Sequence, residues 1–333
     1  MGCNFRSVLT SVPVNALLKT GTSGDGVRVK RTFLLLASLA LVFCACNSTG
    51  SGPSVSTDSR PNVTKLLSHY LPLLRNTPGD TTVYILDSGE PGANMLLVAG
   101  THGNEIAGIH AAELFLALAY VERGKVFVIP RLNNSGVLAG NRLVQPEHQE
   151  QDDPGWFTPP EGVTRYAGAE QRNINRSYPG SVEGGLAQKI ALAVMRLLVY
   201  ENIDIAIDMH EARPSSAIAW AVISNPKNVD VAALAVLDLE EKGISMLLEV
   251  SPPDMDGLSH KEWGNRTQAM AFLIETANPA QENNPSPALL NDPRYALDRR
   301  AAIQLETVRA IVSRSNEALA APLIFSGIPV YRQ

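Results

Sequence analysis

The stretch LLVAGTHGNEIAGIHAAEL, residues 96–114, decides how the rest of the chain is interpreted. It begins as an apolar run that is typical of a buried strand, and it continues from Glu105 with a helical pattern. Polar residues with chemically active side chains stand in the turn between the two elements. Because ligands of open α/β sheets gather beyond the carboxyl ends of the strands, we expect this turn at a binding face. His102 and Glu105, on either side of Gly103, are predicted to aim an imidazole and a carboxylate at one point.

The alternation of strand and helix continues along the body of the chain. Short apolar runs predict strands at 83–87, 95–100, 125–130, 203–210, 217–223 and 271–276, and helical periodicity predicts helices at 105–122, 185–200, 229–242 and 295–313. We therefore expect a single α/β domain with a mixed, largely parallel central sheet that is covered by helices on both faces. Two segments rich in proline and polar residues, 146–168 and the one starting at Asn278, are predicted to be loops, the first of them near the binding face.

The first sixty residues have a different character. Basic residues at 28, 30 and 31 precede an apolar run over 33–43, which is short for a bilayer span and has the length of a signal-peptide core. The segment LVFCAC at 41–46 resembles a bacterial lipoprotein signal, so we expect cleavage before Cys46 and its lipidation. Phe43 and Cys44 depart from that signal, and an ordinary secretory signal is the alternative. Since the basic run begins so late, translation is expected to start near Val27 or Val29.

These features predict the domain organisation and the location of the protein. We expect a leader with a lipoprotein-type signal peptide at 1–46, a flexible linker at 47–61 and a folded domain at 62–333. The protein is then exported to the cell envelope and anchored in the membrane through its N-terminal lipid, facing the periplasm or the exterior. All three cysteines lie within the first 46 residues, so disulfides contribute nothing to the folded domain. The formal net charge of -5 and the lack of a basic stripe argue against a nucleic-acid partner.

A second histidine follows another predicted strand, in the segment IDIAIDMHEARP at 203–214. His210 there is the third candidate ligand, and two histidines with one carboxylate suffice for a catalytic Zn²⁺ ion that keeps one position for water. Asp208 lies two residues earlier on the same face of an extended strand, so it is a candidate for orienting His210, although a purely structural carboxylate is also possible. We expect Glu211 to contact substrate and His260 to be an exposed loop residue.

With these motifs the chain resembles the zinc metallocarboxypeptidase superfamily, and within it the succinylglutamate desuccinylase/aspartoacylase-like branch. The segment GTHGNE at 100–105 is similar to the segment that carries the branch's first two zinc ligands, and DMH at 208–210 to that of the third. Three further segments resemble the branch in order and spacing: VIPRLNNSGVLAGNR at 128–142, RNINRSYPG at 172–180 and AFLIETANP at 271–279. In the second of these, Asn173 stands where the family has an aspartate.

The resemblance implies a role for each residue of these motifs. A single Zn²⁺ ion would be held by His102, Glu105 and His210, and Glu275 would transfer the proton. The remaining roles go to Arg142, which would stabilise the oxyanion, and to Asn175 and Arg176, which would bind a substrate carboxylate.

Some of these roles have competitors in the sequence. Arg131, Arg165 and Arg172 are alternatives to Arg142 for the oxyanion, and Glu211 is the alternative to Glu275 as the proton shuttle. Arg176 could instead be a solvated surface arginine.

The resulting prediction is a zinc-dependent hydrolase in which residues 62–333 form the catalytic domain. It would cleave an amide bond next to a free carboxylate, with a small peptide or an N-acyl amino acid as substrate. Carboxypeptidase-type action on envelope peptides is the first expectation, because exported enzymes meet peptides most readily. The alternatives are deacylation of an N-acyl amino acid and a non-catalytic lipoprotein that binds peptides or cell-wall fragments.

Overall fold

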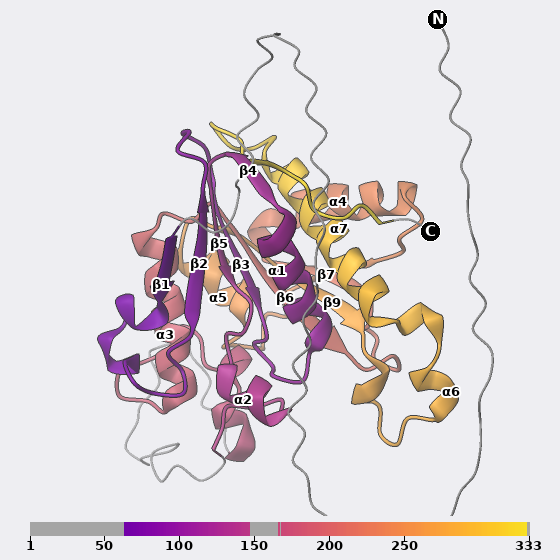
Figure 1. Cartoon of the computed structure of the whole chain (residues 1–333), viewed down its shortest axis with the longest axis horizontal. Coiled ribbons are helices and arrows are strands. Elements are labelled where there is room, and N and C mark those ends of the chain that lie inside the picture. Colours follow the sequence, from indigo (N-terminus) through magenta and orange to yellow (C-terminus); the bar gives the residue numbers. More distant parts are fainter. Residues whose placement is uncertain (1–62, 147–165, 167, 332–333) are drawn as a thin grey trace, which may run out of the picture. The chain divides into compact units, whose positions relative to one another are not determined.

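The computed structural model describes residues 63–146, 166 and 168–331, and its central feature is an eight-stranded sheet (Figure 1). Four neighbouring pairs are parallel (β5 with β3, β3 with β6, β6 with β9, and β7 with β8), and three are antiparallel. The predicted mixed, largely parallel sheet is thereby confirmed. In spatial order the strands are β1 (Val63–Leu66), β2 (Thr82–Asp87), β5 (Lys125–Ile129), β3 (Asn94–Ala99), β6 (Ile205–Ala212), β9 (Met270–Ala277), β7 (Ala221–Ser224) and β8 (Leu247–Val250).

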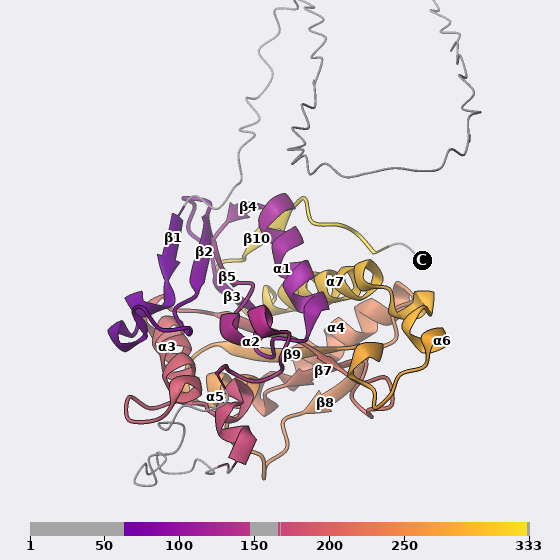
Figure 2. The same ribbon diagram turned by 60° about the horizontal axis from the view of Figure 1, so that its bottom comes forward.

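Helices cover both faces of this sheet, as Figure 2 shows with α1 and α7 on one side and α3 and α5 on the other. A small separate sheet pairs β4 (Tyr120–Arg123) with β10 (Ile324–Ser326). The α-helices are α1 (Ile106–Leu118), α2 (Asn134–Ala139), α3 (Leu186–Tyr200), α4 (Val229–Glu241), α5 (Ser259–Arg266), α6 (Pro287–Leu290) and α7 (Leu297–Ser315). The 3-10 helices are η1 (Leu67–His69), η2 (Pro72–Leu74), η3 (Gly168–Arg172), η4 (Ile174–Arg176), η5 (Pro226–Asn228), η6 (Pro279–Gln281) and η7 (Pro293–Tyr295).

The alternation of side chains along β6 divides the core and positions the polar residues of that strand. Ile207 and Met209 belong to the apolar cluster beneath α1, α4 and α7. Asp208 and His210 therefore point to the opposite face, toward α3 and α5. By the same alternation Glu211 points back beneath α1 and α7. Two neighbours in sequence are thus separated by the sheet.

The helices at 185–200, 229–242 and 295–313 and five of the six predicted strands agree with the structure within two residues at each end. The predicted helix at 105–122 ends at Leu118, because Ala119 is extended and β4 then pairs with β10 near the C-terminus. The predicted strand at 217–223 begins only at Ala221. The segment after Asn278, predicted as a loop, contains η6, α6 and η7.

Several sequence predictions concern residues outside the described ranges. The predicted signal peptide, the predicted lipidation site Cys46 and the predicted linker at 47–61 lie there, as do most of the predicted loop at 146–168 and Arg165. Within the described part of the chain, no helix has both the length and the apolar character that crossing a bilayer requires.

Candidate metal centre

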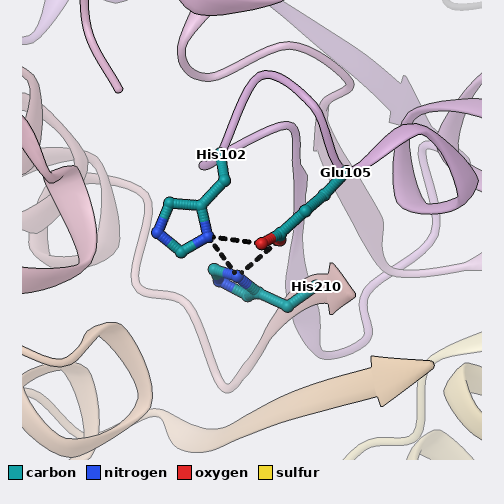
Figure 3. Close-up of side chains that lie close together, drawn as sticks. All are labelled: His102, Glu105 and His210. Atoms are coloured by element: carbon teal, nitrogen blue, oxygen red, sulfur yellow. Dashed lines mark hydrogen bonds and ion pairs between the residues drawn. The ribbon is translucent and has the colours of Figure 1, made fainter. Parts of the chain in front are cut away.

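Three residues that are far apart in sequence meet at the carboxyl ends of β3 and β6. His102 follows β3 in the turn before α1, Glu105 closes that turn, and His210 lies near the end of β6 (Figure 3). The turn depends on Gly103, because a Cβ atom there would lie 2.2 Å from the backbone carbon of Gly136. All three ligand candidates are at most 2% exposed. The group that the sequence predicted is therefore assembled by the fold.

The distances within this group fit a divalent metal ion. The Nδ1 atoms of His102 and His210 lie 3.2 Å apart, and the Glu105 carboxylate oxygens lie 2.7 Å and 2.9 Å from them. Zinc bonds of about 2.0–2.1 Å in a tetrahedron place ligand atoms roughly 3.3 Å apart. Two imidazoles and one carboxylate are also a donor set that catalytic zinc sites use. The residues present therefore fit a zinc ion, with only small adjustments of the side chains.

Asp208 fixes the ring of His210. One carboxylate oxygen lies 2.8 Å from His210 Nε2, and the other accepts a 2.9 Å hydrogen bond from Thr101 Oγ1. Burial disfavours the charged imidazole, but the charges of Asp208 and Glu105 outweigh burial and raise the pKa of His210. The contact at Nε2 directs Nδ1 toward the other two ligands. The prediction that Asp208 orients a ligand thus agrees with its contacts.

Asn173, for which the sequence predicted no role, lies beside His102 as Asp208 lies beside His210. Its Oδ1 lies 3.0 Å from His102 Nε2 and also accepts a hydrogen bond from the backbone N–H of Asn175. Since this oxygen is an acceptor, His102 Nε2 is the donor and Nδ1 is left for a metal. The Asn173 side-chain amide donates to Glu170 Oε2 at 2.7 Å. Only the departure from the family motif at Asn173 pointed to this position.

Glu275 lies directly beside the third ligand candidate. It pairs with His210 in the parallel register of β9 and β6, so the two side chains emerge from neighbouring strands on the same face. Glu275 as a residue is 9% exposed, and its Oε2 atom is buried with no hydrogen-bond partner among the described residues. Burial, reinforced by the negative charge of Glu105, raises the pKa of Glu275 to about 8, whereas the His210 charge lowers it. A carboxylate in this state readily accepts or releases a proton near neutral pH.

Glu211, the predicted substrate contact and alternative proton shuttle, lies elsewhere. Its buried carboxylate pairs with Arg300 of α7 and accepts hydrogen bonds from the backbone of Ala107 and the amide of Asn278. The alternation of β6 places this carboxylate on the far side of the sheet from His210. Both expectations for Glu211 are therefore wrong, because its side chain connects the sheet to α1 and α7.

Arg142 reaches the ligand group, whereas two of its three competitors do not. Its Nη1 donates to Glu105 Oε1 at 2.7 Å, and 40% of the side chain is exposed. Arg131 instead pairs with Glu113, and Arg172 donates to the carbonyl of Val144. Arg142 thus lies beside a candidate metal ligand, and its role in stabilising an oxyanion remains a prediction.

Asn175 and Arg176 lie on η4, next to Asn173. The Asn175 Oδ1 accepts a 2.7 Å hydrogen bond from the backbone N–H of Ser259 at the start of α5. The Arg176 guanidinium donates to the Asn175 carbonyl and lies 5.7 Å from the ring centre of Tyr166. Its side chain is 21% exposed, so it is held in place rather than freely solvated.

His260 is not the exposed loop residue that the sequence predicted. It lies in α5 and is 2% exposed, with neither ring nitrogen bonded to any described residue. Burial lowers its pKa to about 3, so the ring is neutral at neutral pH. The prediction failed because the polar sequence of this helix does not show that it is buried.

Comparison with known proteins shows which family the chain resembles. Residues 91–280 match the model of the succinylglutamate desuccinylase/aspartoacylase catalytic domain. The N-alpha-acetyl-L-2,4-diaminobutyric acid deacetylase of Halomonas elongata is 30% identical over 130 residues, which are 38% of this chain and 31% of that protein.

Two solved structures have a similar fold. They are a succinylglutamate desuccinylase from Silicibacter sp. TM1040 and the ectoine utilization protein EutE (DoeB) from Ruegeria pomeroyi. Each has a TM-score of 0.50 and 16% sequence identity, and the match covers 76% of this chain and 64% of the other. The chain thus spans less than two thirds of the length of these relatives.

Proposed function

This chain belongs to the succinylglutamate desuccinylase/aspartoacylase family, and we propose that it is a zinc-dependent hydrolase that cleaves an amide bond next to a free carboxylate. One observation carries the proposal. The Nδ1 atoms of His102 and His210 and the carboxylate of Glu105 lie within contact distance, and Glu275 stands in register with His210 on the next strand. A zinc ion held by the first three would lower the pKa of a bound water to about 7 and polarise the substrate carbonyl.

The protein's own residues supply the proton transfer and the charge stabilisation. Glu275 takes the proton from the attacking water and delivers it to the leaving amine, because its carboxylate lies beside the ligands without being one of them. The raised pKa of Glu275 allows its carboxylate both to accept the proton from water and to release it to the amine. A bound dication would lower this pKa. Arg142 stabilises the negative charge that develops on the carbonyl oxygen.

Asn175 and Arg176 bind the carboxylate next to the scissile amide. A guanidinium held by the Asn175 carbonyl and the Tyr166 ring has few orientations to lose when a carboxylate binds. A requirement for a carboxylate is common to an N-acyl amino acid and to the C-terminus of a peptide. The deacetylase from Halomonas elongata favours the first substrate class. The lipoprotein-type leader favours the second, since a protein anchored at Cys46 in the cell envelope would meet peptides.

The decisive experiment combines zinc analysis with hydrolysis of matched substrates. Purified protein is expected to contain one zinc ion per chain and to hydrolyse N-acetyl amino acids, dipeptides or both, but not their C-terminal amides. Glu275→Gln should retain zinc and lose at least ~100-fold in kcat. Full turnover by that variant would refute the assigned proton shuttle. Wild-type protein that holds zinc but cleaves nothing in the panel would instead favour the non-catalytic binder.

A further inference from the structure

The last turns of α3 line an open apolar cleft on the surface of the molecule. The rings of His69, Tyr70 and Tyr200 contact one another edge to face there, with ring centres between 5.1 Å and 6.1 Å apart. The cleft has a volume of about 580 Å³, and α3 also contributes Met195, Arg196 and Val199 to its lining. Val199 is 62% exposed and Tyr200 67%. The described residues thus leave large aliphatic and aromatic side chains open to solvent at this point.

Strand β1 extends this surface to the first described residue of the chain. The Lys65 ammonium lies 5.6 Å and 5.8 Å from the ring centres of Tyr70 and Tyr200, so its side chain points toward the cleft. Val63, two residues earlier on the same strand, faces the same side and is 46% exposed. Both views show β1 and α3 at the same end of the sheet (Figures 1 and 2). We call this surface the aromatic patch, and it comprises Val63, Lys65, Tyr70, Arg196, Val199 and Tyr200.

The chemistry of the aromatic patch matches the surface of a lipid bilayer. Glu201 accepts hydrogen bonds from the Lys65 ammonium at 2.6 Å and from the Tyr70 hydroxyl at 2.7 Å, so its charge is balanced within the patch. The exposed Arg196 guanidinium reaches only a backbone carbonyl, at 3.5 Å, and its charge is available to a phosphate. Tyrosine rings and aliphatic side chains next to arginine and lysine are typical of the membrane–water interface, where the basic groups extend to the lipid headgroups.

The segment before the patch favours a bilayer over the chain itself as what covers it. Residues 47–62 separate the predicted lipidation site Cys46 from Val63. A flexible chain of about 16 residues has a typical end-to-end distance of roughly 20–24 Å, so a lipid at Cys46 would keep the patch close to the membrane. This segment has no aromatic residue, and Val55 is its one large aliphatic residue. It therefore lacks the side chains to fill the cleft.

We propose that the aromatic patch is a membrane-contact surface that binds the lipid bilayer. The inference rests on the anchor in the proposed function and is independent of the proposed hydrolysis. It also sets the orientation of the protein. The amide of Asn94, the first residue of β3, donates to the carbonyl of Glu201, so the patch lies near the amino end of that strand. The candidate metal centre lies at its carboxyl end. With the patch on the bilayer, the metal centre faces away from the membrane and is open to water-soluble substrates.

The test uses a polarity-sensitive fluorophore on single cysteines in the full chain. The three native cysteines are replaced by serine, which also removes lipidation from the readout. The label is placed at Val199→Cys, or at Leu237→Cys as the matched control. Leu237 is 55% exposed on α4, which packs against β7 and β8 at the other end of the sheet. Each protein is mixed with vesicles of phosphatidylcholine and phosphatidylglycerol. A third label, at Val63→Cys, is combined with Val199→Glu or with Leu237→Glu, which make the same charge change.

We expect vesicles to shift the emission of the label at position 199 to the blue and to leave the label at 237 unchanged. Val199→Glu should lower the ratio of membrane-bound to solvated label at position 63 by at least ~10-fold, since burial of one aliphatic side chain contributes about that factor. Leu237→Glu should leave this ratio unchanged. The proposal is wrong if neither label responds or if both respond equally. It is also wrong if the label at 199 shifts without vesicles as the protein concentration rises, which would make a second copy of the chain the partner.

Mass spectrometry of the membrane-extracted wild type tests the anchor separately. An unmodified Cys46 together with a vesicle response confined to the patch would refute the lipid anchor and keep the membrane-contact surface. Lipidated protein whose patch does not respond to vesicles would keep the anchor and refute the contact surface.

Discussion

The amide of Asn173 offers a quantitative test of how the first histidine ligand is held. Asn173→Asp restores the residue type of the family motif, but in this chain the new carboxylate oxygen would face Glu170 Oε2, to which the amide now donates at 2.7 Å. Removing a hydrogen bond to a charged group costs about 1.5–3 kcal/mol. Two carboxylates about 4 Å apart repel by roughly 1–4 kcal/mol for effective dielectric constants between 80 and 20. Because 46% of the Glu170 side chain is exposed, the lower end applies to both estimates.

One gain opposes these losses. A carboxylate at position 173 would accept the His102 Nε2–H more strongly than an amide oxygen, by about 1 kcal/mol. Because the two losses together exceed this gain, Asn173→Asp should lower the free energy of unfolding by about 1.5 kcal/mol. In a Glu170→Gln background the repulsion disappears, and the amide introduced at position 170 can donate to the new carboxylate. We expect the double variant to be about as stable as Glu170→Gln alone and to bind zinc at least as tightly as the wild type.

The measurement is a double-mutant cycle on the metal-free proteins, read by urea unfolding, with zinc affinity from competition against a chromophoric chelator. The expected coupling energy between positions 170 and 173 is about 1.5 kcal/mol. A coupling below about 0.5 kcal/mol would mean that Glu170 and Asn173 do not interact as described. A double variant that is as unstable as Asn173→Asp alone would show that the carboxylate is disfavoured by something other than Glu170.

Three other predictions follow from the described contacts. Glu211→Gln leaves the charge of Arg300 buried without its partner and should lower the free energy of unfolding by about 3 kcal/mol, whereas zinc affinity, measured by chelator competition, should not change. Chelation of the metal should lower the melting temperature of the wild type, and His210→Ala should abolish that response, since the metal stabilises only a chain that has the ligands. His260 has a pKa of about 3 in the folded protein and about 6.5 when unfolded, so the unfolded chain binds more protons between these values and stability falls as the pH is lowered through them. His260→Gln should therefore reduce the slope of stability against pH from 6.5 to 4 by up to about 1.4 kcal/mol per pH unit in urea titrations, and an unchanged slope would contradict the burial of a neutral ring.

The sequence was sufficient to predict the ligand group because each member follows an apolar strand at a point that the fold rules identify. His102 and Glu105 follow β3, and His210 lies near the end of β6, whose residues before it are apolar except for Asp208. Where both neighbours of a strand are parallel, its carboxyl end lies beside theirs. The side-by-side register of His210 and Glu275 could not be predicted in this way, since strand order depends on contacts between segments that are 65 positions apart.

Helix α5 shows why hydrophobic periodicity can miss a buried helix. Its sequence SHKEWGNR is polar, yet His260, Lys261 and Glu262 are all at most 9% exposed. Lys261 is buried because carbonyls of the preceding loop satisfy its ammonium, and Glu262 because it pairs with Arg266 four residues later. Hydrophobic periodicity detects helices that bury apolar faces, so it misses one whose buried side chains are polar and paired. His260 is the member of this group without such a partner in the described chain.

The separation of His210 and Glu211 explains why one strand can serve both chemistry and stability. Two consecutive residues of β6 carry groups that titrate or pair, and the pleat sends them to opposite faces. Glu211 is neutralised by Arg300 and holds α1 and α7 against the sheet, while Asp208 orients His210 within the candidate metal centre. A substitution at Glu211 can thus be strongly destabilising without touching the ligands. Because the carbonyl of His210 also accepts a hydrogen bond from Gln304 of α7, the helix layer fixes the backbone at this candidate ligand, and its packing limits how far His210 can move from His102 and Glu105.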